Sequence, residues 1–146
     1  MIEVKEVSTP LELEKVFEIR KKVFVEEQKV PADEEYDEFE NTSKHFLAYF
    51  NGYPAGTSRW RTTTNGAKME RFAVLEEYRS KKVGSALVET VLNDVKKNFG
   101  QEKEIYLNAQ ITAMGLYSKF GFEQVGEMFL ECDIKHYKMV YAGQKM

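Results

Sequence analysis

One short stretch of the chain combines residue types that bind phosphate. It reads "YRSKKVGSALVE" and covers residues 78–89, and its basic side chains are Arg79, Lys81 and Lys82. The small residues that open the helical pattern after them are Gly84, Ser85 and Ala86. A helix N-terminus presents unpaired N–H groups and the positive end of the helix dipole, and small residues let an anion approach the main chain. The stretch therefore predicts a cradle for a diphosphate.

A solvated turn is the alternative interpretation of the same residues. A positive charge near a helix N-terminus opposes the dipole and costs ~0.3–1 kcal/mol unless an anion compensates it. That cost favours the phosphate interpretation. The two common nucleotide-binding motifs, G-x-x-x-x-G-K-[ST] and G-x-G-x-x-G, do not occur in the chain.

The bulk composition predicts one globular domain over residues 1–146 and excludes several function classes. The chain has 42% hydrophobic and 31% charged residues, and its net charge of −3 offers no general attraction to nucleic acid or to an anionic membrane. A single cysteine, Cys132, and two distant histidines, His45 and His136, form no ligand set for a structural metal. Any anion site must therefore be local.

The N-terminal residues carry no targeting pattern. They read "MIEVKEVS", which resembles neither a signal peptide nor a transit peptide, and no stretch approaches the ~18 apolar residues of a membrane span. The sequence therefore predicts a cytoplasmic protein with no membrane contact. It leaves the oligomeric state open between a monomer and a homodimer.

The elements that must position the basic stretch follow from periodicity. A helix is predicted from the cap at Thr9, with Pro10 at its first position and Glu12 completing a capping box, as far as Phe24. Residues 25–43 have no clean period and predict a loop with a short second helix. The longest amphipathic pattern begins at Val83 and predicts a helix that Gly100 ends. A further short helix is predicted over residues 112–120.

Alternating segments predict about seven strands. They cover residues 2–7, 44–50, 55–64, 67–75, 103–110, 122–131 and 133–142, with tight turns at 51–54 and at Asn65–Gly66. The helix between strands 67–75 and 103–110 implies a right-handed crossover, so these two strands run parallel. The fold class is therefore α/β, as an α+β mixed sheet that is mostly antiparallel, with about four helices.

Two motifs in the right order resemble the GNAT superfamily of acyl-CoA-dependent N-acyltransferases. The family's phosphate-loop pattern is [QR]-x-x-G-x-[GA], and "RSKKVG" supplies Arg79 and Gly84 but has Lys82 at the usual first glycine. The family's Asn-x-x-Ala-x-x-x-Tyr-x-x-x-Gly-Phe run resembles "QITAMGLYSKFGF", where Gln110 replaces asparagine. The segments "RKKVFVEEQKVP" and "IKHYKM" are also similar to the ElaA/YjcF-like branch, so the resemblance covers nearly the whole chain.

The resemblance implies a fold with a splayed parallel strand pair and a site for acetyl-CoA (coenzyme A). The pantetheine arm is expected on the main chain of Phe72, Ala73 and Val74. The diphosphate is expected on the amides of Arg79, Ser80, Lys81, Lys82, Val83, Gly84 and Ser85. Gln110 is expected to hydrogen-bond the cofactor.

The transfer chemistry needs an acid, a base and an oxyanion donor. The resemblance assigns protonation of the thiolate to Tyr117 and binding of the thioester carbonyl to a main-chain N–H near Phe72. Glu70, two residues before Phe72 and expected on the same face of its strand, is the candidate base. A core tyrosine and an exposed strand carboxylate are the alternatives for Tyr117 and Glu70. His136 is interpreted as lining the acceptor pocket or as a structural histidine.

The tract "DEEYDEFE" places six carboxylates in eight positions, from Asp33 to Glu40. Such runs are usually solvated surface. The alternative is electrostatic attraction of a cationic acceptor toward the mouth of the site. Cys132 receives no role, because direct transfer needs no covalent intermediate.

These residues favour an N-acyltransferase that moves an acetyl (acyl) group from acetyl-CoA to a primary amine of a small molecule or protein. The amine would attack directly in a ternary complex. The alternative is a non-catalytic GNAT-fold sensor or interaction module that binds acyl-CoA without turning it over. Release of CoA in the presence of an amine distinguishes the two.

Overall fold

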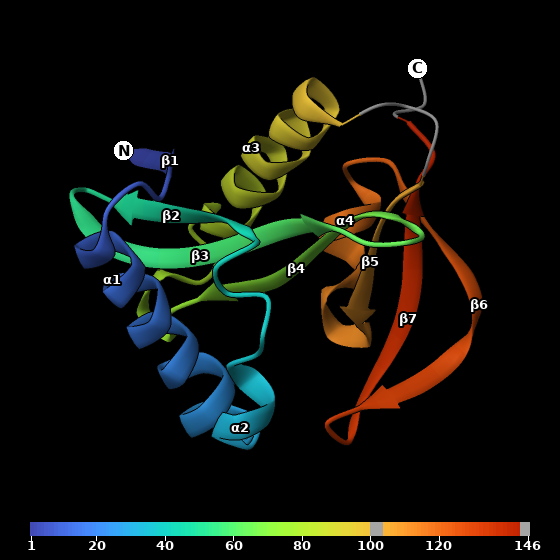
Figure 1. The fold of residues 1–146 in the computed structure, drawn as a ribbon, viewed down its shortest axis with the longest axis horizontal. Coiled ribbons are helices and arrows are strands. Elements are labelled where there is room, and N and C mark those ends of the chain that lie inside the picture. The colour runs from blue at the N-terminus through green and yellow to red at the C-terminus, as the bar shows by residue number, and fades with distance from the viewer. Residues whose placement is uncertain (100–103, 144–146) are drawn as a thin grey trace.

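Seven strands form one twisted sheet in the residues that the structure, a computed structural model, describes; these are 1–99 and 104–143. The sheet order is β1-β2-β3-β4-β5-β7-β6 (Figure 1). Among the described strands, β4 and β5 are the one parallel pair of neighbours. The strands are β1 (Ile2–Glu6), β2 (Lys44–Phe50), β3 (Tyr53–Thr62), β4 (Gly66–Val74), β5 (Glu104–Gln110), β6 (Phe122–Glu131) and β7 (Ile134–Tyr141). This arrangement confirms the predicted fold class.

The first helix begins where the sequence predicts. α1 (Pro10–Arg20) is capped by Thr9, whose hydroxyl accepts from the N–H of Glu12 at 3.2 Å while the Glu12 carboxylate accepts from the N–H of Thr9 at 3.2 Å. The chain then continues as a π-helix, η1 (Lys21–Glu27). The other helices are α2 (Ala32–Glu35), η2 (Glu76–Tyr78), α3 (Val83–Asn98), η3 (Ile111–Ala113) and α4 (Met114–Ser118).

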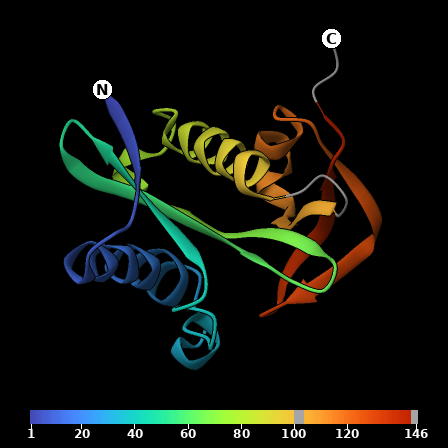
Figure 2. The ribbon, with the colours of Figure 1, turned by 45° about the horizontal axis from the view of Figure 1, so that its top comes forward.

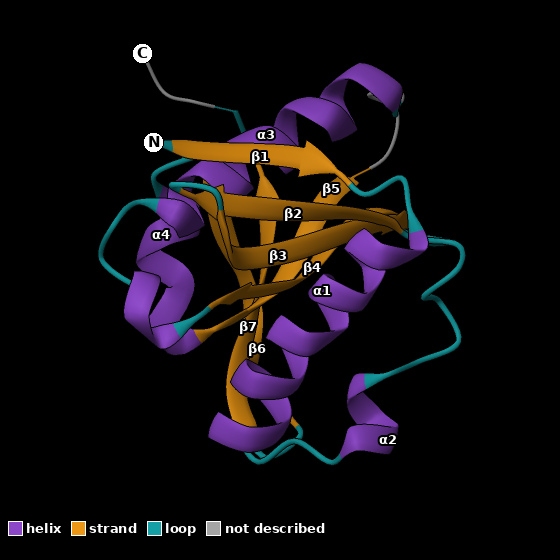
Figure 3. Cartoon of the chain, turned by 90° about the vertical axis from the view of Figure 1, so that its left-hand side faces the viewer, coloured by secondary structure: helices purple, strands orange, loops and turns teal. Residues whose placement is uncertain are grey.

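The helices cover both faces of the sheet and bury a core on each. Figure 2 shows α1 on one face and α3 on the other, and Figure 3 shows α1 crossing in front of the strands. The α3 face buries the larger core, which includes Leu87, Val91 and Met69. The α1 face buries a smaller core around Val16, Leu47 and Ala73. The amphipathic pattern of α3 is thus explained by its burial against the sheet.

The parallel pair β4–β5 separates soon after it begins. The two strands pair only at Gly66–Glu104, Ala67–Ile105 and Lys68–Tyr106, and then diverge (Figure 1). Gly66 allows the close start, because a Cβ on it would lie 2.0 Å from the main-chain oxygen of Glu104. This separation confirms the splayed pair that the family resemblance predicted, and it leaves a cleft between the strands.

A β-bulge lies in β4 just beyond that point. In the register with β3, Glu70 pairs with Arg59 and Ala73 pairs with Thr57, so Arg71 and Phe72 share the place opposite Ser58. Arg71 has a φ of 60°, which is uncommon for a residue other than glycine.

The bulge reverses the side-chain alternation of β4. Phe72 therefore packs with the α3-side core, while Glu70 pairs with arginines on the α1 side. The prediction that Glu70 and Phe72 share one face was wrong, because it assumed uninterrupted alternation.

Some boundaries also differ from the predictions. The turn after β3 is centred on Thr64 and Asn65, since Thr63 and Gly66 exchange main-chain hydrogen bonds of 2.7 and 3.2 Å. The short helix predicted over residues 112–120 is η3 followed by α4, which ends at Ser118. The predicted helix end at Gly100 and the predicted strand start at Lys103 lie outside the described residues.

Candidate active site

A cleft of about 480 Å³ opens where β4 and β5 separate. η1 and α2 line it on one side and the β6–β7 hairpin lines it on the other, and it reaches Val74 and Arg79 at the end of β4. It includes six residues of the predicted site besides Arg79. They are Glu70, Phe72, Ala73, Val74, Gln110 and Tyr117. Segments far apart in the sequence therefore meet at this cleft, as the family resemblance predicted.

Tyr117 lies in α4 with its ring against Phe72. The ring centroids are 5.5 Å apart in an edge-to-face arrangement, and only 6% of Tyr117 is exposed. Its hydroxyl has no hydrogen-bond partner within the described part of the chain, and burial raises its pKa well above the usual value. A neutral, unpaired hydroxyl in a cleft can donate a hydrogen bond to a ligand atom, while its raised pKa makes loss of the proton itself less favourable.

The basic loop before α3 presents a run of free main-chain donors. The N–H groups of Ser80 through Ser85 donate to no main-chain carbonyl in the described residues, and the first such bond in α3 comes from Ala86 to the oxygen of Lys82, at 3.1 Å. Ser80 and Lys82 have φ values of 65° and 70°. Lys82 thus adopts the left-handed conformation that glycine adopts most readily, which explains how lysine can occupy the family's usual glycine position.

Arg79 differs from its predicted place in this cradle. Its N–H donates to the oxygen of Glu76 at 3.2 Å, so that amide is already used. Its guanidinium makes two hydrogen bonds of 2.7 Å to the Glu27 carboxylate and one of 3.0 Å to the oxygen of Val74. Arg79 therefore links the end of β4 to η1, and it occupies a carbonyl on which the pantetheine was expected.

Gly84 has a packing reason for being small. A Cβ on it would lie 3.3 Å from Cδ2 of Leu116 and 3.9 Å from Cγ2 of Val74. Its missing side chain therefore faces α4 and β4, where α3 packs closely. A bulky substitution there would disturb this packing as well as any ligand on the loop.

Glu70 is surrounded by cations. It accepts from Nε of Arg59 at 2.9 Å and from Nε of Arg61 at 2.7 Å, and Nζ of Lys68 lies 3.2 Å away. Burial alone would raise its pKa, but Arg59, Lys68 and Arg61 together lower the pKa to about 2. A carboxylate held in this way binds a proton weakly, so its surroundings argue against the predicted role of Glu70 as the base.

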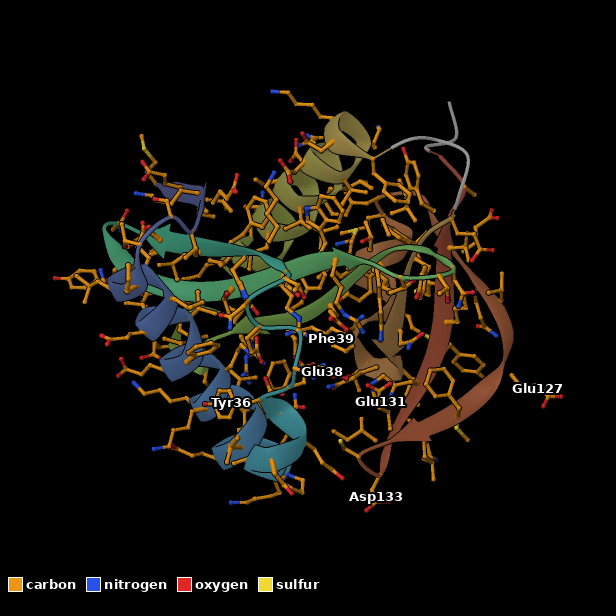
Figure 4. The ribbon with its side chains drawn as sticks, viewed as in Figure 1. Tyr36, Glu38, Phe39, Glu127, Glu131 and Asp133 are labelled. Carbon is orange, nitrogen blue, oxygen red and sulfur yellow. The ribbon has the colours of Figure 1, made fainter. Side chains whose placement is uncertain are left out.

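The acidic tract is only partly solvated. Glu35 is 3% exposed and accepts from Nε of Arg20 at 2.6 Å. Asp37 accepts from Nη2 of Arg59 at 2.6 Å, and Glu40 binds both arginines. The solvated interpretation holds for Asp33, Glu34 and Glu38, which are exposed. Figure 4 shows the segment of Glu38 and Phe39 that connects α2 to β2.

Sequence reasoning did not place Gln28 or Cys132 in the cleft, and both line it. Gln28 bonds the side chain of Gln110 at 3.0 Å, 82 positions away, so that Gln110 is already paired across the cleft. Cys132 donates to Glu34 at 3.2 Å, and burial together with Glu34 raises its pKa to about 11, which keeps the thiol protonated. No local pattern reveals these contacts.

His136 is hydrogen-bonded, as expected of a structural histidine, and it also lines the cleft, as expected of a pocket residue. Its Nδ1 lies 2.6 Å from the oxygen of Ile134, and its ring stacks on Phe129 at 5.7 Å. Because a carbonyl oxygen only accepts, Nδ1 carries the hydrogen, and in the neutral form of the ring Nε2 has the lone pair.

Comparisons with known proteins agree with this geometry. The model of the acetyltransferase (GNAT) domain family matches residues 7–142. The uncharacterized N-acetyltransferase YjcF of Bacillus subtilis is 38% identical over 130 residues, which are 88% of this chain and 91% of that protein. Escherichia coli ElaA superposes with a TM-score of 0.81 at 26% identity, over 96% of this chain and 99% of that one. A GNAT acetyltransferase of Elizabethkingia anophelis with acetyl-CoA bound has a TM-score of 0.63 at 17% identity, over 95% and 94%.

The chain belongs to the GNAT acetyltransferase family, and its likeness to YjcF and ElaA confirms the predicted branch. It is an acetyltransferase of this class, and the comparisons give no support to the non-catalytic alternative. In residues 1–99 and 104–143, no helix has the length and apolar character needed to cross a membrane.

Proposed function

We propose that the protein transfers an acetyl group from acetyl-CoA to a primary amine by direct attack in a ternary complex. The observation that carries the proposal is the splayed cleft, which has an unpaired tyrosine hydroxyl in its wall and a loop of free N–H groups beyond its end. The catalytic unit in this proposal is a single domain spanning residues 1–146. The cytoplasmic location stays a prediction, and the oligomeric state stays open.

The proposed donor site uses main-chain groups on two elements. The N–H groups of Ser80 to Ser85 would hold the diphosphate, with Lys81 and Lys82 adding positive charge. The main chain of Phe72 and Ala73 would hold the pantetheine, because Arg79 already occupies the Val74 carbonyl. Phe72 lies outside the pairing register with β3, and β5 has already separated from β4, which supports a role for its N–H toward the thioester oxygen.

Acetyl-CoA supplies the acetyl group as an activated thioester. The amine nitrogen forms a bond to the carbonyl carbon, the carbon–sulfur bond breaks, and the nitrogen loses a proton. In the proposal, the Tyr117 hydroxyl gives its proton to the departing sulfur. Solvent then restores the tyrosine proton.

The proton that leaves the amine needs an acceptor with a free lone pair. We assign this step to Nε2 of His136, directly or through one water, rather than to Glu70. The support is that His136 lines the cleft with Nδ1 fixed by Ile134, whereas Glu70 is saturated by cations. A carbonyl that accepts from Nδ1 favours the tautomer in which Nε2 can accept a proton.

Two measurements test the proposed function. Acetyl-CoA or CoA should raise the melting temperature, since a ligand at ~100 times its Kd adds ~2.7 kcal/mol to stability. CoA release should then be measured against a broad panel of primary amines. No thermal shift at millimolar CoA would contradict the donor site, and a shift without turnover of any amine would favour a binding protein.

A further inference from the structure

The cleft contains one arginine whose hydrogen bonds are incomplete. Arg71, on the bulge of β4, donates from Nη2 to Asp37 at 3.2 Å and to the main-chain oxygen of Glu35 at 3.4 Å. Its Nε lies 3.5 Å from the Glu35 carboxylate but is buried without a hydrogen-bond partner in the described residues. Buried donors are rarely left unpaired, because they lose their hydration without compensation.

The ion-pair network around Arg71 has a surplus of positive charge. Among the described residues its carboxylates are Glu35, Asp37, Glu40 and Glu70. Its cations are Arg20, Arg59, Arg61, Lys68 and Arg71. His45, which contacts Glu40, adds no charge because burial lowers its pKa. Of the five cations only Lys68 and Arg71 line the cleft.

Two further carboxylates in the cleft do not pair with the surplus positive charge of this network. Glu34 on α2 and Glu131 on β6 line the same space, and neither forms an ion pair with Arg71 among the described residues. Figure 4 shows Glu131 between α2 and β7. Charges of both signs therefore line the cleft, a pattern that matches a molecule carrying both charges. The cations are Lys68, Arg71 and Arg79, and the carboxylates are those of Glu27, Glu34, Glu35, Glu70 and Glu131.

We propose that Arg71 binds a carboxylate of the acyl acceptor, so that the substrates are amines that also carry a carboxylate, such as α-amino acids. Nε is buried from solvent and Nη2 already donates to Asp37 and to the Glu35 oxygen. The donor open to a carboxylate in the cleft is therefore Nη1, which makes no hydrogen bond among the described residues. The ammonium end of the same molecule would lie toward Glu34, Glu131 and His136. This inference rests on the proposed acyltransferase function.

The test compares acceptors that differ only in the carboxylate. Each amino acid is assayed beside its amide and its decarboxylated amine, with CoA release as the readout. The carboxylate-bearing member should have a kcat/KM higher by roughly 10- to 1,000-fold, because without the carboxylate the Arg71 guanidinium loses its charged partner in the cleft. Equal or better use of the amides and decarboxylated amines overturns the inference.

Variants of two arginines make the test specific. Arg71→Gln should abolish the preference with unchanged CoA affinity, and Arg71→Lys should keep part of it. Arg61→Gln removes one charge from the same network but does not line the cleft, so the preference should persist. Loss of CoA affinity in Arg71→Gln with the preference retained would place Arg71 in the donor site instead. If Arg71→Gln does not fold, the preference of the parent protein for carboxylate-bearing acceptors still tests the inference.

The outcomes separate this inference from the proposed function. Turnover of amines without any preference for a carboxylate contradicts only the inference. Turnover of no amine contradicts the proposed function, and calorimetry of the matched acceptors with the CoA complex then decides whether Arg71 holds a carboxylate. Equal binding of the matched acceptors, or binding of none, overturns the inference.

Discussion

A single oxygen atom, the Tyr117 hydroxyl, carries the proposed acid step. Tyr117→Phe keeps the ring that packs on Phe72 and Phe122, so folding and CoA affinity should survive. The rate of CoA release should fall by ~10²–10⁴-fold, the usual contribution of a positioned acid. The measurement is kcat beside CoA affinity in the same variant. Turnover within about threefold of the parent would show that another group protonates the sulfur.

The two candidates for the base can be separated at the same scale. His136→Gln should lower kcat by ~10²-fold or more while stability and CoA affinity change little. Glu70→Gln should mainly lower the free energy of unfolding, by ~3–5 kcal/mol, because Arg59 and Arg61 lose a buried partner. Chemical denaturation and steady-state kinetics of both variants decide. The opposite pattern would restore Glu70 as the base.

At the scale of elements, the loop before α3 combines a binding conformation with backbone strain. Ser80 and Lys82 hold positive φ values, whereas Lys81 does not. Glycine relieves this strain, which costs ~1–2 kcal/mol per residue for non-glycine types. Ser80→Gly and Lys82→Gly should therefore each raise the melting temperature by about 2–4 °C.

The control for the loop is Lys81→Gly, which gains no relief and should leave stability equal or lower. Ser80→Gly should keep CoA affinity, because the main-chain donors remain. Calorimetric melting of the three variants gives the comparison. A drop in melting temperature for both Ser80→Gly and Lys82→Gly would mean that the loop does not hold these angles in solution.

At the scale of the whole molecule, titration of the buried network predicts how stability depends on pH. Burial lowers the pKa of His45, so the unfolded chain takes up a proton first as the pH falls below ~6.5. Burial opposes ionisation of Asp37 and Glu70, but their arginine partners lower both pKa values to about 2. Their contribution to stability is present above the unfolded values near 4 and is lost as the pH falls toward 2. Glu35 opposes this trend, since burial raises its pKa.

The expected result is a decline in the free energy of unfolding in two steps, first below pH ~6.5 and then below pH ~4.5. Urea unfolding between pH 8 and 3 measures it. His45→Gln should remove the first step and keep the second. A free energy of unfolding that stays level or rises from pH 7 to pH 5 would contradict the assignment to His45.

The sequence by itself determined the features that depend on near neighbours. The capping box of Thr9 and Glu12 spans three positions, and the apolar period of α3 repeats within one helix, so both could be read directly. The order of elements fixed the parallel β4–β5 pair, and two motifs indicated the family before any geometry was known. The sequence also located the proposed phosphate loop at Ser80–Ser85, because the residues that mark a helix start are near neighbours in the chain.

Only the tertiary structure decided how the site is charged and which way its side chains point. One extra residue at Arg71 turned Phe72 and Glu70 to opposite faces, and alternation in the sequence gives no sign of such a bulge. Most partners of Glu70 and of the acidic tract lie on other strands and helices, as with Arg61–Glu70, 9 positions apart, and Arg71–Asp37, 34 positions apart. Charge pairing acts through space, so only the fold brings these groups together at the cleft.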